Sequence, residues 1–359
     1  MSSPLFDGIV AHRVTTPRLT ANVLERPAAD GSPAAGLVAT SPVVFIHGNV
    51  SSSLFYQPSM RALPAGVRAL AIDLRGFGDS ETLPVDATRG VRDFSDDVAS
   101  VLAELGVDRA HLVGWSMGGG IVMQLMLDHP ELIETVTLES PVSPYGFGGT
   151  TGADGRRLDD AGAGTGGGGA NPDFVAGLQA QDAASDGPTS ARGVYRSAYV
   201  KEPRDDHEEV WVESMLTTKT GVDNYPGDSV PTDAWPGFGA GTRGVLNTMT
   251  PNHFDTSGIV DLASKPPVLW IHGVDDAIVS DGSFFDLNML GKVGVIPGWP
   301  GDEIAPPQPM VTQTRAVLTR YRDAGGAFTE LALDDSGHGP HLDQAAAFDA
   351  ALAKHIGAA

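Results

Sequence analysis

The ten residues "HLVGWSMGGG" (111–120) place a single serine, Ser116, between two glycines directly after an apolar run. Serine is a poor strand former, and glycine weakens both strands and helices, so this stretch breaks local propensity at one point. The residues before it read as a strand, and residues 117–130 begin a helix. We interpret the stretch as a sharp strand-to-helix turn of the G-x-S-x-G kind, which lifts the serine hydroxyl clear of a sheet.

Apolar, β-branched runs recur on both sides of this turn, with helical patterns between them. The runs predict buried strands at 42–48, 67–76, 109–116, 133–140, 265–273 and 327–339. Helices are predicted at 91–107, 309–326 and 341–357, and residues 9–16 and 19–26 suit an antiparallel hairpin. Alternating strands and helices predict an α/β fold with a mostly parallel central sheet flanked by helices on both faces.

Two segments interrupt this alternation. Residues 141–264 lie between two predicted strands, are too long for a connection and include a Gly-rich run (146–174) that is nearly structureless by composition. We expect them to form an inserted cap packed over the sheet. Residues 281–308 contain four prolines and form a second irregular insertion, expected near the active site. The core is then formed by residues 1–140 and 265–359.

Composition limits the class of protein and its partners. The chain has 359 residues, of which 41% are hydrophobic and 19% charged, as in soluble globular proteins. Its net charge of −22 repels nucleic acid and anionic membranes, so neither is an expected partner. That charge fits an ordinary solvated surface or adaptation to high salt. The absence of cysteine excludes thiolate chemistry and disulfides.

The first ten residues lack the basic and apolar regions of a secretory signal, and no apolar run is long enough to span a bilayer. We therefore expect a cytoplasmic protein. The sequence leaves its oligomeric state open.

A serine hydroxyl needs a general base to act as a nucleophile near neutral pH, and the base needs an acid to orient it. His338 follows the last predicted strand, where a loop at the carboxyl edge of the sheet can reach Ser116. His341 lies close by but begins the next helix, and we treat it as a bystander.

The orienting acid is expected at the end of another strand. Asp275 and Asp276 follow the strand at 265–273, and Glu139 ends the strand at 133–140 as an alternative acid. The order Ser116…Asp276…His338 is the one that the strand–turn–helix architecture uses.

Backbone N–H groups suit the stabilisation of a developing oxyanion, because they are held in position before the reaction. Met117, directly after the candidate nucleophile, provides one such group. Asn49, in the loop after the strand at 42–48, provides the second, and its side-chain amide is a further candidate donor. This chemistry requires no metal and no organic cofactor.

Five short motifs together resemble the α/β-hydrolase superfamily, and in particular its serine esterases. They are "HGN" (47–49), "DLRGFGDS" (73–80), "GWSMG" (114–118), "GVDDAIV" (273–279) and "SGHG" (336–339). The resemblance implies that the fourth position of G-x-x-D-x-x-V, Asp276, is the acid. It also implies a mainly structural role for Asp73, Arg75 and Ser80. Haloalkane dehalogenases and epoxide hydrolases are similar at "HGN" but use an aspartate nucleophile, which argues against both.

The resemblance leads us to expect a serine hydrolase that cleaves a small carboxylic ester or lactone through an acyl-enzyme. An amidase or aminopeptidase is one alternative, since the acidic stretch 202–213 could bind a substrate amine. A carbon–carbon bond hydrolase of the same fold and a ligand-sensing protein with little turnover are others. We expect the cap to control the choice of substrate rather than the chemistry.

Overall fold

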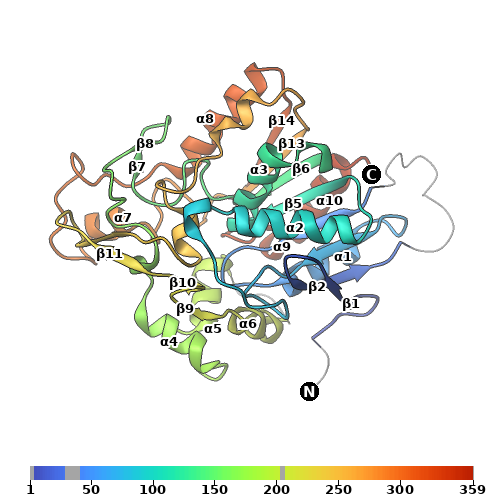
Figure 1. Cartoon of the computed structure of the whole chain (residues 1–359), viewed down its shortest axis with the longest axis horizontal. Helices are drawn as coiled ribbons and strands as arrows, with labels where there is room; N and C mark the ends of the chain where they lie inside the picture. The colour runs from blue at the N-terminus through green and yellow to red at the C-terminus, as the bar shows by residue number, and fades with distance from the viewer. Residues whose placement is uncertain (1–3, 29–40, 203–206, 359) are drawn as a thin grey trace.

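The computed structural model describes residues 4–28, 41–202 and 207–358, and in these residues one eight-stranded sheet forms the centre of the molecule (Figure 1). In spatial order its strands are β1 (Val10–Thr15), β2 (Thr20–Arg26), β4 (Ala69–Ile72), β3 (Val43–Ile46), β5 (Ala110–Trp115), β6 (Ile133–Glu139), β13 (Val268–Gly273) and β14 (Phe328–Leu333). Strands β1, β2 and β4 pair antiparallel, and all the other pairings in this sheet are parallel. The predicted mostly parallel sheet and its leading hairpin are confirmed.

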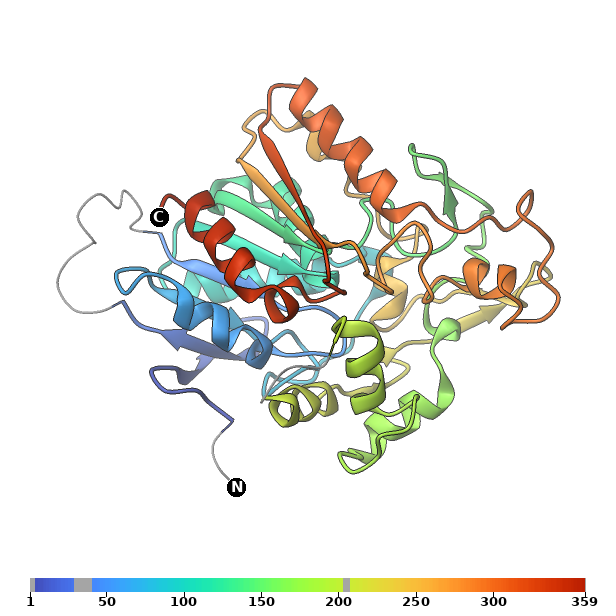
Figure 2. The ribbon, with the colours of Figure 1, turned by 180° about the vertical axis from the view of Figure 1, so that it is seen from behind.

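Helices cover both faces of this sheet. Helices α2 (Arg92–Glu104) and α3 (Met117–Asp128) pack together over one face, and α1 (Gln57–Ala62) and α10 (Ala345–His355) cover the other (Figures 1 and 2). Helix α8 (Met310–Asp323) packs against β14 and the short helix η7 (Ser257–Asp261). Within the described residues, no helix combines the length and the apolar character that a membrane span requires.

The helix predicted at 341–357 is divided in two, α9 (Pro340–Asp343) and α10. Gln344, between them, leaves the helical conformation with φ −126° and ψ 45°. Its side-chain amide donates to the backbone carbonyls of Asp334 and Asp335 (3.3 and 3.2 Å), which holds α9 against the loop after β14.

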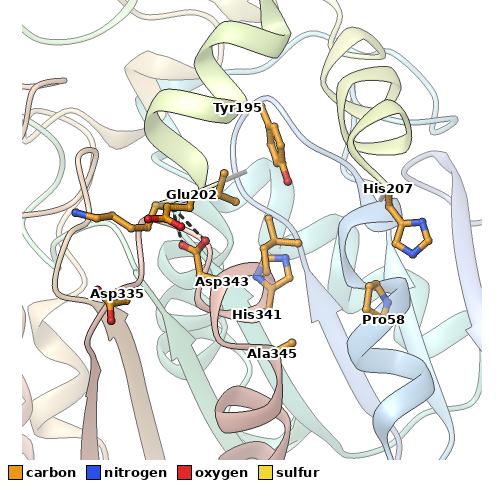
Figure 3. A pocket seen from close by; sticks show the side chains of 11 residues that line it. Pro58, Tyr195, Glu202, His207, Asp335, His341, Asp343 and Ala345 are labelled. Carbon is orange, nitrogen blue, oxygen red and sulfur yellow. Dashed lines mark hydrogen bonds between the residues drawn. The ribbon is translucent and has the colours of Figure 1, made fainter. Parts of the chain in front are cut away.

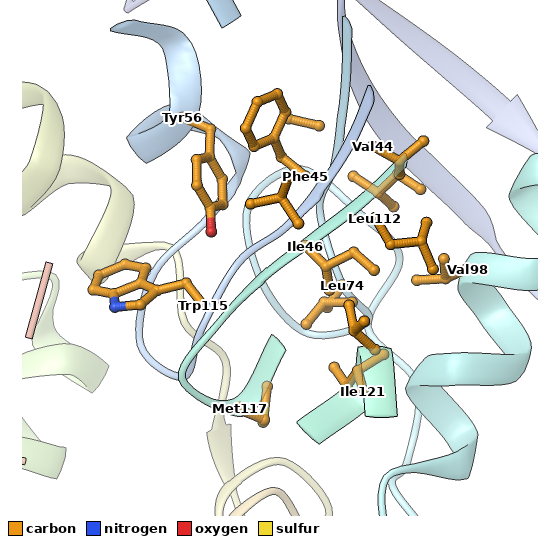
Figure 4. Close-up of a cluster of buried hydrophobic side chains, with 14 of the residues drawn as sticks. Val44, Phe45, Ile46, Tyr56, Leu74, Val98, Leu112, Trp115, Met117 and Ile121 are labelled. Atoms are coloured by element: carbon orange, nitrogen blue, oxygen red, sulfur yellow. The ribbon is translucent and has the colours of Figure 1, made fainter. Parts of the chain in front are cut away.

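The apolar core explains why the central strands are continuous hydrophobic runs. Every residue of β3 and β5 is buried, because helices cover both faces, whereas the edge strand β1 is mostly exposed. Figure 4 shows side chains of these strands between Val98 of α2, Ile121 of α3 and, on the other side, Tyr56. Tyr56 ends η1 (Ser53–Tyr56), and its ring lies 4.7 Å from that of Phe45.

Residues 141–264 form short elements beside the carboxyl ends of the strands. They are β7 (Thr150–Thr151), β8 (Arg156–Arg157), η4 (Gly167–Gly169), α4 (Pro172–Ala180), α5 (Ala191–Val194), η5 (Tyr195–Tyr199), α6 (Glu208–Leu216), β9 (Thr220–Gly221), β10 (Tyr225–Pro226), β11 (Ser229–Pro231), β12 (Phe238–Ala240), η6 (Leu246–Met249) and η7. Two short helices of the core, η2 (Ala87–Arg89) and η3 (Pro130–Leu132), complete the helical elements before this segment.

The Gly-rich run 146–174 is more ordered than its composition predicts, because distant glutamines hold it. The Gln308 side chain accepts from the Gly148 N–H (2.5 Å) and donates to the Gly146 carbonyl (3.0 Å). The Gln313 amide donates to the Gly152 carbonyl (3.0 Å). Residues 281–308 are mainly irregular and contain one short helix, α7 (Leu287–Lys292).

The turn between β5 and α3 is possible only without side chains at its flanks. Ser116 has φ 57° and ψ −118°, in a region that non-glycine residues rarely adopt. A Cβ on Gly118 would lie 2.1 Å from the carbonyl oxygen of Ile46, and one on Gly114 would lie 2.3 Å from that of Gly118. The start of α3 therefore packs directly on the backbone of β3 and β5.

Replacing Gly118 by alanine should destabilise the fold by about 3 kcal/mol, because the new Cβ can be accommodated only by moving backbone. Gly177 in α4 is the matched control, since a Cβ there meets nothing within 4 Å. Gly177→Ala should be neutral or stabilise by up to about 1 kcal/mol through helix propensity. Urea unfolding measures both free energies, and equal effects would contradict the packing argument.

His111 at the start of β5 couples folding to pH. Burial lowers its pKa from 6.5 to about 4, against an opposing effect of Glu134 and with smaller lowering effects of His355 and Arg109. Its Nδ1 lies 3.0 Å from the Thr135 hydroxyl, and its Nε2 is buried with no partner among the described residues. A proton on this ring is therefore disfavoured in the folded chain.

Because the folded pKa lies below the unfolded value, the unfolded chain binds this proton more readily. The contribution to stability is complete above about pH 6.5 and is lost as the pH falls towards about 4, by up to about 3 kcal/mol. His111→Gln should remove that part of the pH dependence of the unfolding free energy between about pH 7 and about pH 4.5. A variant with the same pH dependence as the wild type would rule out this role.

Candidate active site

A cavity of about 350 Å³ opens at the carboxyl ends of the parallel strands, and Ser116, His338 and Asn49 all line it. Ser116 follows β5, Asn49 follows β3, and His338 lies in the loop after β14. Because parallel strands end at one edge of the sheet, their loops bring these distant residues together. Residues of both interrupting segments line the rest of the cavity, among them Val142, Phe147, Phe174, Leu246, Leu287 and Leu290.

Asp276 contacts His338 from behind the cavity. Its Oδ2 lies 2.9 Å from Nδ1 of the imidazole, and both side chains are almost completely buried. The other carboxylate oxygen, Oδ1, accepts the N–H groups of Ile278 (2.7 Å) and Val279 (2.9 Å). Since a carboxylate only accepts, Nδ1 carries a proton in this contact, and the tautomer of the neutral ring that fits it has its lone pair on Nε2.

The two other candidate acids lie elsewhere. Asp275 diverges from its neighbour, and its Oδ1 lies 2.9 Å from the Lys201 ammonium nitrogen. Glu139 contacts His341 rather than His338: its Oε1 lies 2.6 Å from the ring Nδ1 and accepts the backbone N–H of the same residue at 2.9 Å.

His341 is thus the buried partner of Glu139, and it does not line the cavity that Ser116 lines. The Tyr56 hydroxyl also donates to this carboxylate (3.2 Å). Burial, together with the charge of Glu139, raises the pKa of Tyr56 well above its usual value.

The predicted oxyanion donors lie at the two backbone segments that meet beside Ser116. Met117 is the first residue of α3, and a Cβ on Gly48, just before Asn49, would lie 3.0 Å from that of Ser116. Across the described residues, neither the Met117 nor the Asn49 N–H donates to a protein acceptor. The Asn49 side-chain oxygen is buried and has no partner there either.

The motif at 73–80 makes contacts within the protein rather than at the cavity. Asp73 accepts the Ser53 N–H (2.7 Å) and the Asn22 side-chain amide (2.8 Å). The Ser80 hydroxyl donates to the Asp73 carbonyl (2.6 Å). Arg75 pairs with Asp97, with Nε 2.6 Å from a carboxylate oxygen.

Trp115 and Tyr199 hold the loops of this site, and the sequence analysis assigned neither of them this role. The Trp115 indole N–H donates to the carbonyl of His338 (2.7 Å), although the two are 223 residues apart in the chain. The Tyr199 hydroxyl reaches the carbonyls of Asn49 and Val50, both at 3.0 Å. Neither residue belongs to a local pattern that could have indicated its partner.

Comparison with known proteins gives matches in sequence and in structure. A carboxylesterase of Bacillus subtilis is 29% identical over 103 residues, which are 29% of this chain and 34% of the relative. Each of the first curated relatives is matched over at most about a third of its length.

Solved structures match over nearly the whole chain and show the fold. An esterase of Exiguobacterium antarcticum superposes with a TM-score of 0.58 at 16% identity, covering 97% of this chain and 99% of the other. A putative aryl esterase of Burkholderia cenocepacia has a TM-score of 0.57 at 17% identity, with 97% and 98% covered.

The family described as "alpha/beta hydrolase fold" matches residues 41–283, more than half of the chain. The matched residues include strand β5, the strained turn at Ser116 and helix α3. The chain belongs to the α/β-hydrolase family.

Proposed function

We propose that this protein is a serine hydrolase that cleaves carboxylic esters, lactones included, through an acyl-enzyme. The observation that carries the proposal is the buried His338–Asp276 pair on the wall of the cavity that Ser116 also lines. Relatives named carboxylesterase and esterase support ester hydrolysis. The detailed roles of the residues are proposed from their chemistry.

In the first half of the reaction, the Ser116 Oγ attacks the ester carbonyl and its proton passes to Nε2 of His338. Asp276 stabilises the imidazolium through Nδ1–H. The N–H groups of Met117 and Asn49 bind the oxyanion of the tetrahedral intermediate. The intermediate collapses, the C–O bond to the alcohol breaks, and the alcohol leaves with the proton from Nε2.

In the second half, a water molecule gives its proton to Nε2 and its oxygen attacks the acyl carbon. The ester bond to Ser116 then breaks, the serine regains the proton, and the carboxylic acid leaves. Besides the substrate and water, these steps use only side chains and backbone groups of this chain.

The lining of the cavity favours an apolar substrate. Aromatic and aliphatic side chains from 141–264 and from 281–308 face it, and the pocket is of the size that accommodates small organic molecules. Among the described residues, Asp286 contributes the one carboxylate of the lining, and it accepts the backbone N–H groups of Asn288 (3.0 Å) and Gln308 (2.7 Å). We propose that 141–264 is a cap and, with 281–308, selects esters with apolar groups.

The amidase alternative has less support. Of the stretch 202–213, residues 203–206 lie outside the described residues. Glu208 and Glu209 pair with Arg192 (the longer contact is 2.8 Å), and Glu208 also pairs with Arg196 (2.7 Å). Described residues of this stretch do not line the cavity, so they offer no site for a substrate amine there.

A substrate panel tests the reaction class. We expect turnover of p-nitrophenyl esters and aromatic lactones, with kcat/KM rising as the acyl chain lengthens from acetyl until the cavity is filled. Ser116→Ala should lower kcat by at least about 10⁴-fold. Turnover restricted to amino-acid amides would favour an aminopeptidase. Tight binding of esters without turnover would favour a ligand sensor.

The acid is tested by three isosteric changes. Asp276→Asn removes the acceptor that keeps the proton on Nδ1, and it should lower kcat by at least about a hundredfold with the fold intact. Asp275→Asn should be mild. Glu139→Gln should also be mild in kcat, although it weakens a buried contact to His341 and should lower the melting temperature. If Glu139→Gln abolished activity and Asp276→Asn left kcat nearly unchanged, Asp276 would be misassigned as the acid.

A further inference from the structure

Residues 199–201, which we call the strap, run between two cavities. Tyr199 lines the cavity that holds Ser116. Val200 and Lys201 line a second cavity of about 300 Å³, together with Asp343 (Figure 3). The strap belongs to the segment 141–264, and it contacts two loops of the core and helix α9.

The side chain of Tyr199 holds the loop after β3. Its hydroxyl shares one proton between the carbonyls of Asn49 and Val50, each at 3.0 Å. Burial raises the pKa of this phenol, so it stays protonated and keeps donating. Val50 has φ 49°, a left-handed conformation that is strained for a β-branched residue and persists only where contacts hold it.

The backbone of the strap holds the loop that carries His338. The carbonyl of Tyr199 accepts the N–H of Gly339 at 2.8 Å. The Asp343 carboxylate, which is labelled in Figure 3, accepts the N–H group of Lys201 (2.9 Å). It also accepts the N–H group of Gly337 (2.7 Å). The residues on both sides of His338 are therefore bonded to the strap or to the carboxylate that holds it.

The ion pair between Lys201 and Asp275 is weaker than the buried hydrogen bonds of the strap. The Lys201 ammonium lies 2.9 Å from Asp275, beside Asp276, but its side chain is 42% exposed. Exposed pairs contribute little, so we assign the effect to the buried hydrogen bonds.

We propose that Tyr199 is a positioning residue: it sets the oxyanion donor of Asn49 and the base His338 at the separation that the reaction needs. The proposal rests on the function proposed above. One residue contacts both loops, through its hydroxyl on one side and its carbonyl on the other. It follows that the segment 141–264 contributes to the chemistry and not only to substrate choice.

If Tyr199 acted through packing alone, removal of its hydroxyl would not change kcat. The ring of Tyr199 lies 5.4 Å from that of Trp115 and 6.1 Å from that of Phe55, so it also fills space. Tyr199→Phe keeps the ring and removes only the hydroxyl. Tyr321→Phe is the matched control, because its buried hydroxyl also donates to a backbone carbonyl, that of Pro266 (2.6 Å), and it lies outside the cavity lining.

The first experiment separates kcat from KM with the best ester of the panel. Tyr199→Phe should lower kcat by about 10- to 100-fold and change KM by less than about twofold, since a misaligned donor weakens the transition state and not substrate binding. Tyr321→Phe should lower the melting temperature to a similar extent and leave kcat within about twofold. Tyr199→Phe with wild-type kcat, or equal losses of kcat in both variants, would overturn the proposal.

The second readout needs no substrate. A fluorophosphonate labels Ser116 when Oγ attacks phosphorus, fluoride leaves and the proton passes to His338, so the rate depends on the same base and oxyanion donors. Labelling should be at least about tenfold slower in Tyr199→Phe than in Tyr321→Phe. Equal rates would overturn the role of Tyr199 even in a protein that turned over no ester. Efficient labelling of wild type without ester turnover would overturn only the proposed function.

Asp343→Asn tests the contact at the other end of the strap. It also provides a test of the proposal if Tyr199→Phe does not fold. An amide keeps only one acceptor oxygen for the N–H groups of Lys201 and Gly337, and its NH₂ group cannot accept them. We expect a several-fold loss of kcat and of the labelling rate at unchanged KM. Wild-type values of both would show that the strap does not position His338.

Discussion

The close approach of two backbones at Gly118 is the constraint on which the rest of the site depends. A side chain there would meet the Ile46 carbonyl at 2.1 Å, so only glycine lets the start of α3 lie against the end of β3. This contact brings the loop after β3 beside the serine and leaves Ser116 at φ 57°. The Ser116 carbonyl accepts the N–H groups of Gly119 (3.0 Å) and Val142 (3.1 Å), which hold the strained turn from both sides.

Two buried histidine–carboxylate pairs flank Trp115, and only one of them reaches the cavity. The Trp115 ring lies 5.5 Å from that of His338 and 5.0 Å from that of His341. Asp276 and Glu139 bind these two rings in the same way, through Nδ1. The first pair has its second nitrogen available for a proton transfer at the cavity. The second pair is buried away from Ser116, with no partner for Nε2 among the described residues, and we assign it to the packing between α9 and β6.

The segments 141–264 and 281–308 form part of the site itself. Their apolar side chains supply most of the cavity wall, and the strap joins the loops after β3 and β14. Those loops carry the proposed base and an oxyanion donor, and the strap is hydrogen-bonded to both of them. In our proposal, the strands of the core place the loops, and the irregular segment 141–264 adjusts the final separation of their functional groups.

Local patterns were sufficient for the α/β class, the strands of the central sheet, the helices α2, α3, α8 and α10 and the serine turn, because period, β-branching and glycine spacing report on a residue's immediate neighbours. The motif resemblance indicated Asp276 over Asp275 and Glu139, and in the structure Asp276 is the one that contacts His338. What only the tertiary structure decided are the partners across long loops: Glu139 with His341, Tyr199 with Asn49, and Gln308 with the Gly-rich run. These contacts join residues about 150 to 200 positions apart, where no periodicity connects them, and each depends on the exact path by which the insertions return to the sheet.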